Sequence, residues 1–346
     1  MVQTGSTVSP VTTPPSAPRG RTPLVLALVG SALVGAAVAT ALILGLGLGV
    51  AGGGGAPVAE DAQRAAEAAE PEIDTTKLAW APPELEDPTT IEVKEGNREF
   101  HLDRDKDYVL EMPDEPLDVR GGLVVNGGRN VVVIGGEIRI TRSGDRAQEI
   151  RGLYFRGQEG TVHAEGLLIT GDELGEGINL DQRRGAMVQL QNIRVETVHG
   201  EKEGQHADVL QTWAGPAELR VDKLTGYTTY QGLFLLPRQF TDEDPERFDL
   251  RRVNIRGADD AAYMLWRDGE DWPIDVQDVW VAPAEEDNRT EDDDVEAFVW
   301  SGREGAGSWE DVQVGVPPGG DFVKAEDVGL GYESPGYLED AEQPEG

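Results

Sequence analysis

A short strand-like pattern recurs seven times in this chain, at intervals of about 29 residues. Each copy starts with an aliphatic residue and then alternates, as in Ile193-Arg194-Val195. The starting residues are Ile138, Leu167, Ile193, Leu224, Val253, Val279 and Val312, with spacings of 29, 26, 31, 29, 26 and 33. A fixed period of roughly 20–50 residues is typical of stacked-repeat architectures. Because the unit here is a strand, the sequence predicts a β-solenoid.

A second set of strand-like segments supports this prediction, because each precedes a member of the first set by 15 to 21 residues. The segments are 152–155, 177–180, 208–211, 232–235, 262–265 and 297–300. Side chains alternate across a strand, which predicts two groups. The inward group is Leu153, Phe155, Ile178, Leu180, Val209, Leu233, Leu235, Tyr263, Leu265, Phe298 and Trp300. The outward group is Tyr154, Arg156, Asn179, Asp181, Asp208, Leu210, Thr212, Phe234, Leu236, Met264 and Trp266.

The glycine- and valine-rich string from Gly127 to Ile138, followed by repeats to about Val314, resembles the pectate-lyase-like superfamily. This resemblance implies an all-β, right-handed parallel β-helix of about seven coils from a bacterium. It carries no specific activity, because the superfamily contains lyases, hydrolases, epimerases, adhesins and proteins without known chemistry. In the family, a ligand groove often runs along one sheet face.

Charge and composition exclude several classes of partner. The formal net charge is −35 and only six of the 30 basic residues are lysine, whereas nucleic-acid binding needs clustered Lys and Arg. We therefore expect no nucleic-acid partner, and the acidic chain should repel an acidic polymer unless cations intervene. The chain has no cysteine, so it forms neither disulfides nor cysteine-based metal sites.

The N-terminal region predicts a membrane anchor. The 28 residues from Leu24 to Ala51 carry no charge, and about 20 apolar residues suffice to cross a bilayer as a helix. Arg19 and Arg21 precede this stretch, and the first acidic residue after it is Glu60. The positive-inside rule then predicts a single-pass protein of the cell membrane with an extracellular C-terminal domain. If the segment is instead a long signal peptide that is cleaved, the protein is secreted.

These observations predict five regions along the chain. Residues 1–22 form a disordered cytoplasmic tail rich in Thr, Ser and Pro, and residues 23–51 form the anchor. Residues 52–90 are a linker that begins with glycines and contains prolines. Residues 91–330 form the β-helix, and residues 331–346 form a disordered acidic tail.

Seven residues of the predicted outward face are candidates for contact with a ligand. They are Tyr154, Arg156, Asn179, Asp181, Thr212, Phe234 and Trp266. Arg156 and Asp181 should be neighbours on adjacent strands. They form either a surface ion pair, worth about 0–1 kcal/mol, or a charge pair that holds a sugar carboxylate or hydroxyl.

His206 and Asp208 are the candidate catalytic residues, because they stand two residues apart on one strand face. His206 could act as a base near neutral pH while Asp208 orients it or binds a cation. The alternative is structural, with Asp208 satisfying a turn. We expect no metal and no cofactor. A Ca²⁺ site is not supported by the spacing, because Asp181 and Asp208 should lie roughly 13 Å apart.

Together these features favour an extracellular, membrane-anchored protein that contacts an extended polysaccharide or cell-surface glycan along one sheet face. One alternative is a polysaccharide lyase or a related carbohydrate-active enzyme. A second alternative is a structural surface module without a ligand.

Overall fold

The computed structural model describes residues 75–142, 147–201, 204–258, 261, 263–268, 272–284, 309 and 311–338. The chain divides into two compact units, Met1–Ala68 and Ala69–Gly346, and every described residue belongs to the second. The expected cytoplasmic tail (1–22) and membrane anchor (23–51) lie outside the described residues. Within the described ranges, no helix has the length and apolar character that a membrane crossing requires.

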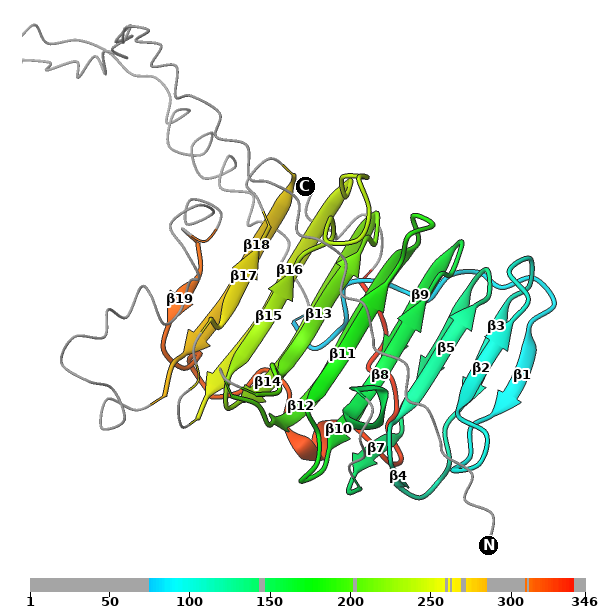
Figure 1. The fold of residues 1–346 in the computed structure, drawn as a ribbon, viewed down its shortest axis with the longest axis horizontal. Coiled ribbons are helices and arrows are strands. Elements are labelled where there is room, and N and C mark those ends of the chain that lie inside the picture. The colour runs from blue at the N-terminus through cyan, green and yellow to red at the C-terminus, as the bar shows by residue number, and fades with distance from the viewer. Residues whose placement is uncertain are drawn as a thin grey trace, which may run out of the picture. The chain divides into compact units, whose positions relative to one another are not determined.

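The second unit is a parallel β-solenoid of the right-handed type with about six turns and almost no helix (Figure 1). In the described ranges, the helical pieces are two 3-10 turns, η1 (Ala147–Ile150) and η4 (Ala325–Asp327). This confirms the predicted all-β parallel solenoid, with about six turns in place of the seven expected.

One side of the solenoid is a seven-stranded sheet in which all neighbouring strands are parallel. In spatial order its strands are β2 (Glu99–Leu102), β5 (Leu123–Gly127), β8 (Arg151–Arg156), β11 (Glu176–Asp181), β13 (Asp208–Ala214), β15 (Gln231–Leu235) and β17 (Leu265–Arg267). Neighbouring strands lie about 4.8 Å apart, so this sheet extends for about 30 Å along the solenoid axis.

The remaining sides form a twelve-stranded sheet. Its strands are β1 (Thr89–Glu92), β3 (Tyr108–Glu111), β4 (Leu117–Val119), β6 (Val131–Ile134), β7 (Glu137–Ile140), β9 (Thr161–Glu165), β10 (Leu168–Thr170), β12 (Met187–Val198), β14 (Glu218–Thr228), β16 (Arg247–Gly257), β18 (Ile274–Ala282) and β19 (Gln313–Val314). Strand β9 pairs with the first half of β12, whereas β10 pairs with its second half. The sheet is therefore folded along a line that crosses its long strands, and it supplies two sides of the coil.

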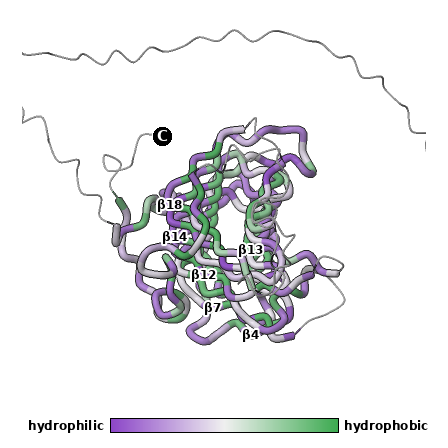
Figure 2. The backbone as a smooth tube through the Cα atoms, turned by 90° about the vertical axis from the view of Figure 1, so that its left-hand side faces the viewer, coloured by the Kyte–Doolittle hydropathy of each residue, from purple (hydrophilic) through white to green (hydrophobic). Residues whose placement is uncertain are grey.

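A left-handed backbone conformation recurs at this fold line. Asn192, Lys223, Arg252 and Asp278 have φ angles of 49°, 56°, 49° and 54°, which is uncommon for residues other than glycine. Each precedes one of the repeat residues identified in the sequence, such as Ile193. The turn allows core residues on both sides of it to point inward, and Figure 2 shows hydrophobic residues gathered around the inside of the coil.

The strand register confirms most of the predicted repeat. Ile193, Leu224, Val253 and Val279 are successive partners across β12, β14, β16 and β18. The first interval is wrong, because Ile138 pairs with Ile169 and not with Leu167. Two residues separate the strands at this corner in both coils, so the equivalent of Leu167 is Gly136, two positions before Ile138.

Alternation within the seven-stranded sheet fails near the start of most strands, where two consecutive residues face the core. A Cβ on Gly152 would come within 2.3 Å of the core atom Cγ2 of Ile169, so Gly152 points inward, as does the buried Leu153 that follows it. In β13 the same kink turns both Val209 and Leu210 inward.

The kink overturns four predicted orientations. Leu210 and Thr212 were expected outside, but Thr212 pairs with Leu180 and Leu235 in the core and is fully buried. Met264 likewise belongs to the core, and Tyr263 faces outward against other aromatic rings. The physical reason is that side chains alternate between the core and the outside only after the bend in the strand.

The segment 75–80, assigned to the linker from sequence, packs on the outward face of the twelve-stranded sheet. Asp222 accepts a hydrogen bond from the Ala79 amide at 2.8 Å, and Gln191 bonds both the amide and the carbonyl of Trp80. The Trp80 ring lies 4.8 Å from the guanidinium carbon of Arg251. These contacts make residues 75–80 a strap across β12, β14 and β16.

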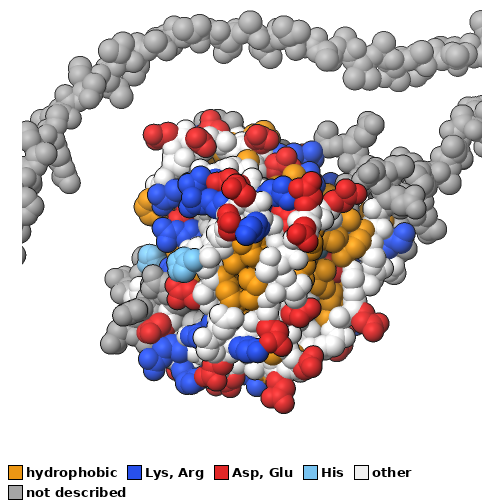
Figure 3. All heavy atoms as spheres, turned by 90° about the vertical axis from the view of Figure 1, so that its right-hand side faces the viewer, with side chains coloured by type: hydrophobic (Ala, Val, Ile, Leu, Met, Phe, Trp, Pro, Cys, Tyr) orange, Lys and Arg blue, Asp and Glu red, His pale blue; other side chains and the backbone are white. Residues whose placement is uncertain are grey.

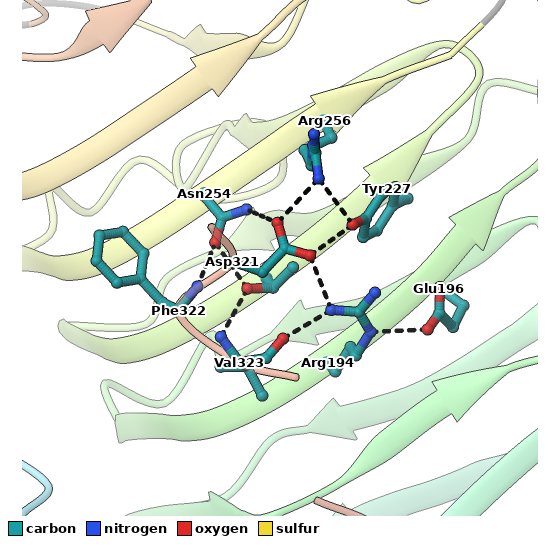
Figure 4. Close-up of polar contacts among 9 residues, drawn as sticks. Arg194, Glu196, Tyr227, Asn254, Arg256, Asp321, Phe322 and Val323 are labelled. Carbon is teal, nitrogen blue, oxygen red and sulfur yellow. Dashed lines mark hydrogen bonds and ion pairs between the residues drawn. The ribbon is translucent and has the colours of Figure 1, made fainter. Parts of the chain in front are cut away.

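A second strap, residues 320–338, crosses the same sheet from the C-terminal side, and Asp321 is its main attachment (Figure 4). The Asp321 carboxylate accepts hydrogen bonds from Arg194 at 3.1 Å, Tyr227 at 2.5 Å, Asn254 at 3.0 Å and Arg256 at 3.3 Å. Burial acts to raise the pKa of Asp321, but the hydrogen bonds from Tyr227 and Arg194 lower it below its ordinary value. One carboxylate thus fastens the strap to three strands.

The end of this strap includes the described part of the expected disordered tail. Tyr332 and Tyr337 each donate a hydrogen bond of 2.8 Å to the buried Glu165, which also contacts His163. Tyr337 forms a parallel bridge with Leu78, which joins the two straps. Residues 331–338 therefore pack on the solenoid, because burying two tyrosines against a carboxylate outweighs the polar composition of the segment.

The N-terminal end of the solenoid presents the edge strands β1 and β2. Figure 3 shows hydrophobic side chains at the centre of this end, with charged side chains around them. Ile91 and Leu102 of this first coil are partly buried and pack against the core.

We predict that Asp321→Asn loosens the C-terminal strap and lowers the free energy of unfolding by about 2 kcal/mol, because an amide cannot accept from both arginines. Thermal unfolding followed by circular dichroism would measure the loss, and tryptic cleavage after Lys324 in the strap should become faster. Asp311→Asn is the control, since Asp311 is an exposed carboxylate. Equal cleavage rates for wild type and Asp321→Asn would contradict the role given to Asp321.

Candidate functional site

The two sheets differ in what covers their outward faces. The straps lie on the twelve-stranded sheet and take up its buried polar groups, including Asp222, Gln191 and Glu165. The outward face of the seven-stranded sheet contains two adjoining hollows and a row of aromatic side chains. This second face, the open face, is therefore the candidate site.

Parallel register arranges the open face into columns. One column contains Glu99, Val124, Tyr154, Asn179, Gln211, Phe234 and Trp266, which are successive partners across all seven strands. A second column contains His101, Asn126, Arg156 and Asp181 on the first four strands. Equivalent side chains thus repeat at about 4.8 Å along the axis, which suits a ligand that is itself extended.

The second column lines the hollows at the N-terminal half of this face. The larger hollow has a volume of about 1090 Å³ and the smaller about 430 Å³. His101, Asn126 and Arg156 line both, so the two hollows form one groove. The other lining residues are Leu102, Asp103, Arg104, Asp105, Gly127, Gly157, Glu159, Asp181, Arg183 and Arg184 in the larger hollow, and Arg98, Glu99, Arg120, Gly121, Gly122, Val124, Glu149 and Tyr154 in the smaller.

Asp181 is the most constrained charged group of the groove. Its side chain is nearly buried and lies between two arginines, with Arg183 donating to Oδ1 at 2.8 Å and Arg156 at 3.5 Å from Oδ2. The predicted proximity of Arg156 and Asp181 is therefore confirmed. Arg156 is more than half exposed, so this pair alone contributes little to stability.

Aromatic rings occupy the C-terminal half of the open face. The Phe234 and Trp266 rings are 5.2 Å apart, and Tyr263 lies 5.5 Å from Trp266. Tyr230 continues the row at 6.0 Å from Tyr263, and the exposed His206 follows at 5.2 Å. Phe234, Trp266 and Tyr263 are only half-buried, so they offer apolar ring surface to a ligand.

Trp213 joins the aromatic rings to the groove. Its ring contacts Tyr154 edge-on at 5.5 Å, and the guanidinium carbon of Arg151 lies 4.5 Å from its centre. Beneath these groups, Asn179 is fully buried and donates to Gln211 at 3.2 Å, while its Oδ1 has no hydrogen-bond partner.

A buried polar column lies at the start of the strands, beside the aromatic rings. Arg151 and Glu176 form an ion pair of 2.5 Å, and Gln205 donates to the other oxygen of Glu176. Asp208 is paired in register with Gln231, and one oxygen of each lacks a hydrogen-bond donor. Burial, reinforced by the negative charge of Glu176, raises the pKa of Asp208 well above its ordinary value.

The raised pKa of Asp208 favours a neutral carboxyl group, which can donate a hydrogen bond. Asp208 Oδ1 and Gln231 Oε1 are two buried acceptors on neighbouring strands, and buried acceptors are rarely left without a donor. A neutral carboxyl group would donate from Asp208 to its neighbour and avoid burying a charge beside Glu176. Asp208 is thus suited to be a neutral hydrogen-bond donor within the stack.

The structure places the predicted site residues as follows. Tyr154, Arg156, Asn179, Asp181, Phe234 and Trp266 lie on the open face, although Tyr154 and Asn179 are buried there. Thr212 is wrongly assigned, since it faces the core. His206 and Asp208 do share a strand entry, but His206 is exposed against Tyr230 whereas Asp208 is buried near Glu176.

Several groups on this face were not found from sequence. Gln211 and Trp213 occupy the outward positions that alternation gave to Leu210 and Thr212. Moving the inward–outward alternation by one residue after Val209 would have identified both residues. Arg183 and His101 give no comparable signal, because they lie beyond the repeat segments used in the sequence analysis.

In the part of the chain that the structure describes, no group of three or more His, Cys, Asp or Glu side chains could hold a metal ion. Comparison with known proteins identifies no matching family model, no matching curated protein and no matching solved structure.

We predict that Asp208→Asn stabilises the protein near neutral pH, by about 1–2 kcal/mol, the usual scale for an unsatisfied buried group. The raised pKa means that the folded state keeps a proton that the unfolded chain releases above its ordinary pKa of 3.8. Stability is therefore lost as pH rises above that value, and asparagine removes this dependence.

Urea unfolding of both proteins at about pH 4 and about pH 7 would measure the effect. The difference should be small at the lower pH and larger at the higher. Asp114→Asn, at an exposed carboxylate, is the control. A loss of stability in Asp208→Asn at neutral pH would show that Asp208 is needed as a carboxylate.

Proposed function

We propose that this domain binds an extended polysaccharide along the open face. The observation that carries the proposal is the alignment of a polar groove and exposed aromatic rings on one seven-stranded sheet, about 30 Å long. Sugars present hydroxyl groups at their edges and apolar C–H groups on their faces. The polar column of His101, Asn126, Arg156 and Asp181 suits the edges, and Phe234 with Trp266 suits the faces.

We further propose that the domain is displayed outside a bacterial cell on a single N-terminal membrane helix, and that it is a divergent member of the pectate-lyase-like superfamily. The uncharged stretch from Leu24 to Ala51 supports the anchor, and the parallel solenoid supports the superfamily. Cleavage of that stretch would instead give a secreted protein. Fractionation of cells that express the full chain distinguishes membrane-bound from released protein.

Binding has more support than catalysis on this face. A catalytic pair must reach its substrate, and Asp208, the partner proposed for the exposed His206, is buried. A polysaccharide lyase is a second proposal, because the exposed His206 lies at the entry of the strand that begins with Asp208. A structural module without a ligand is the third.

We predict that Trp266→Ala weakens binding to a responsive polysaccharide about tenfold, because loss of an aromatic platform costs about 1–2 kcal/mol. Affinity electrophoresis of the full chain against a polysaccharide panel, followed by calorimetry with the best ligand, would measure it. Trp80→Ala is the matched control, since Trp80 lies on the strapped sheet. Equal losses in both variants, or no binding by the wild type, would contradict the proposal.

For the enzymatic alternative, we predict that prolonged incubation of the wild-type protein with the same panel releases no new reducing or unsaturated ends. Product formation that disappears in a folded His206→Ala variant would instead establish catalysis. Circular dichroism of that variant provides the folding control, because the exposed His206 is not part of the core.

A further inference from the structure

The charges of the groove differ from those of the whole chain. The chain has a formal net charge of −35. The two hollows together are lined by six arginines and six acidic residues, so their formal charges cancel. The arginines are Arg98, Arg104, Arg120, Arg156, Arg183 and Arg184, and the acidic residues are Glu99, Asp103, Asp105, Glu149, Glu159 and Asp181.

Most of these arginines already have partners within the protein. Arg156 and Arg183 flank Asp181, and Arg184 lies 2.9 Å from Glu159. Arg98 donates to backbone carbonyls, including that of Gly121 at 2.8 Å. A guanidinium that is neutralised by a carboxylate attracts an anion weakly, since the two charges act on the ligand with opposite sign.

Two arginines of the groove lack such partners. Among the described residues, neither Arg104 nor Arg120 forms a side-chain hydrogen bond or an ion pair, whereas Arg98, which also lacks a carboxylate partner, donates to backbone carbonyls. They line different hollows, Arg104 the larger and Arg120 the smaller. Single exposed cations in a strongly acidic protein do not make the clustered basic surface that holds a polyanion.

The groove instead offers hydrogen-bond donors and acceptors close together. Asp181 is fixed by its two arginines and keeps acceptor capacity, because a carboxylate has about four lone-pair sites. Asn126 donates to the carbonyl of Phe100, which fixes its amide on the groove floor. A sugar hydroxyl both donates and accepts, so it can use an acidic group and the neighbouring guanidinium at the same time.

Resting on the proposed function, we infer that the polysaccharide bound along the open face is uncharged, and that Asp181 with Arg156 forms its hydroxyl-binding subsite. The aromatic pair of Phe234 and Trp266, on the same face, packs against its ring faces. A polyuronate or a sulfated glycan is excluded as ligand, because the balanced groove does not offset repulsion by the rest of the chain.

The test measures binding of the full chain, solubilised in detergent, to galactomannan, mixed-linkage glucan and arabinan as uncharged probes, and to polygalacturonate and chondroitin sulfate as polyanions. We expect an uncharged polymer to bind best, with a dissociation constant that changes less than about twofold between about 50 mM and about 500 mM NaCl. Asp181→Ala should weaken that binding about tenfold. Asp114→Ala, which removes an exposed acid outside the groove, should leave it within about twofold.

Arg104→Glu provides the complementary variant, since it reverses the charge of an exposed, unpaired arginine. Preferential binding of a polyanion, with strong salt dependence and loss in Arg104→Glu, would overturn the inference while leaving polysaccharide binding intact. If none of the probes binds, both the inference and the proposed function fail.

Discussion

Stacking of equivalent core residues is the constraint on which the rest of this structure depends. Ile193, Leu224 and Val253 lie over one another because each coil must bury its apolar side chains against the next. The same stacking leaves no room for a side chain at Gly177 and Gly232, whose Cβ atoms would come within 2.8 Å of Val195 and Ile255. Once the core is stacked, outward side chains are forced into columns, and the groove follows the solenoid axis.

Burial of polar groups separates the two sheets. On the strapped sheet, Glu165, Asp222 and Asp321 all receive hydrogen bonds from residues of distant segments or strands. The straps thus supply hydrogen-bond partners for the buried polar groups of one sheet from the protein's own backbone and side chains. The other sheet keeps buried acceptors without a donor at Asn179, Asp208 and Gln231.

Periodicity predicted the solenoid because the repeat is local: each unit carries its own apolar residues, and neighbouring units are about 29 residues apart. It could not predict the straps. The bond from Ala79 to Asp222 spans 143 positions and that from Tyr337 to Glu165 spans 172, and neither segment is apolar or periodic. Thr212 was misplaced for a different reason, since a single kink at Val209 and Leu210 reverses the alternation that follows it. The pairing of Arg156 with Asp181 was predicted correctly, because the register between β8 and β11 is unbroken from Leu153 to Arg156.

Net charge gives a poor description of how this protein meets a ligand. Exposed charges separated by more than about 8–10 Å are largely screened at physiological ionic strength, so a ligand in the groove responds mainly to the groups around it. Most of the arginines there already have partners, and Asp181 lies between Arg156 and Arg183. The acidic surface then acts at longer range and at low salt, where it repels anionic polymers before contact. Short-range hydrogen bonding and long-range repulsion therefore both favour an uncharged polysaccharide as the ligand.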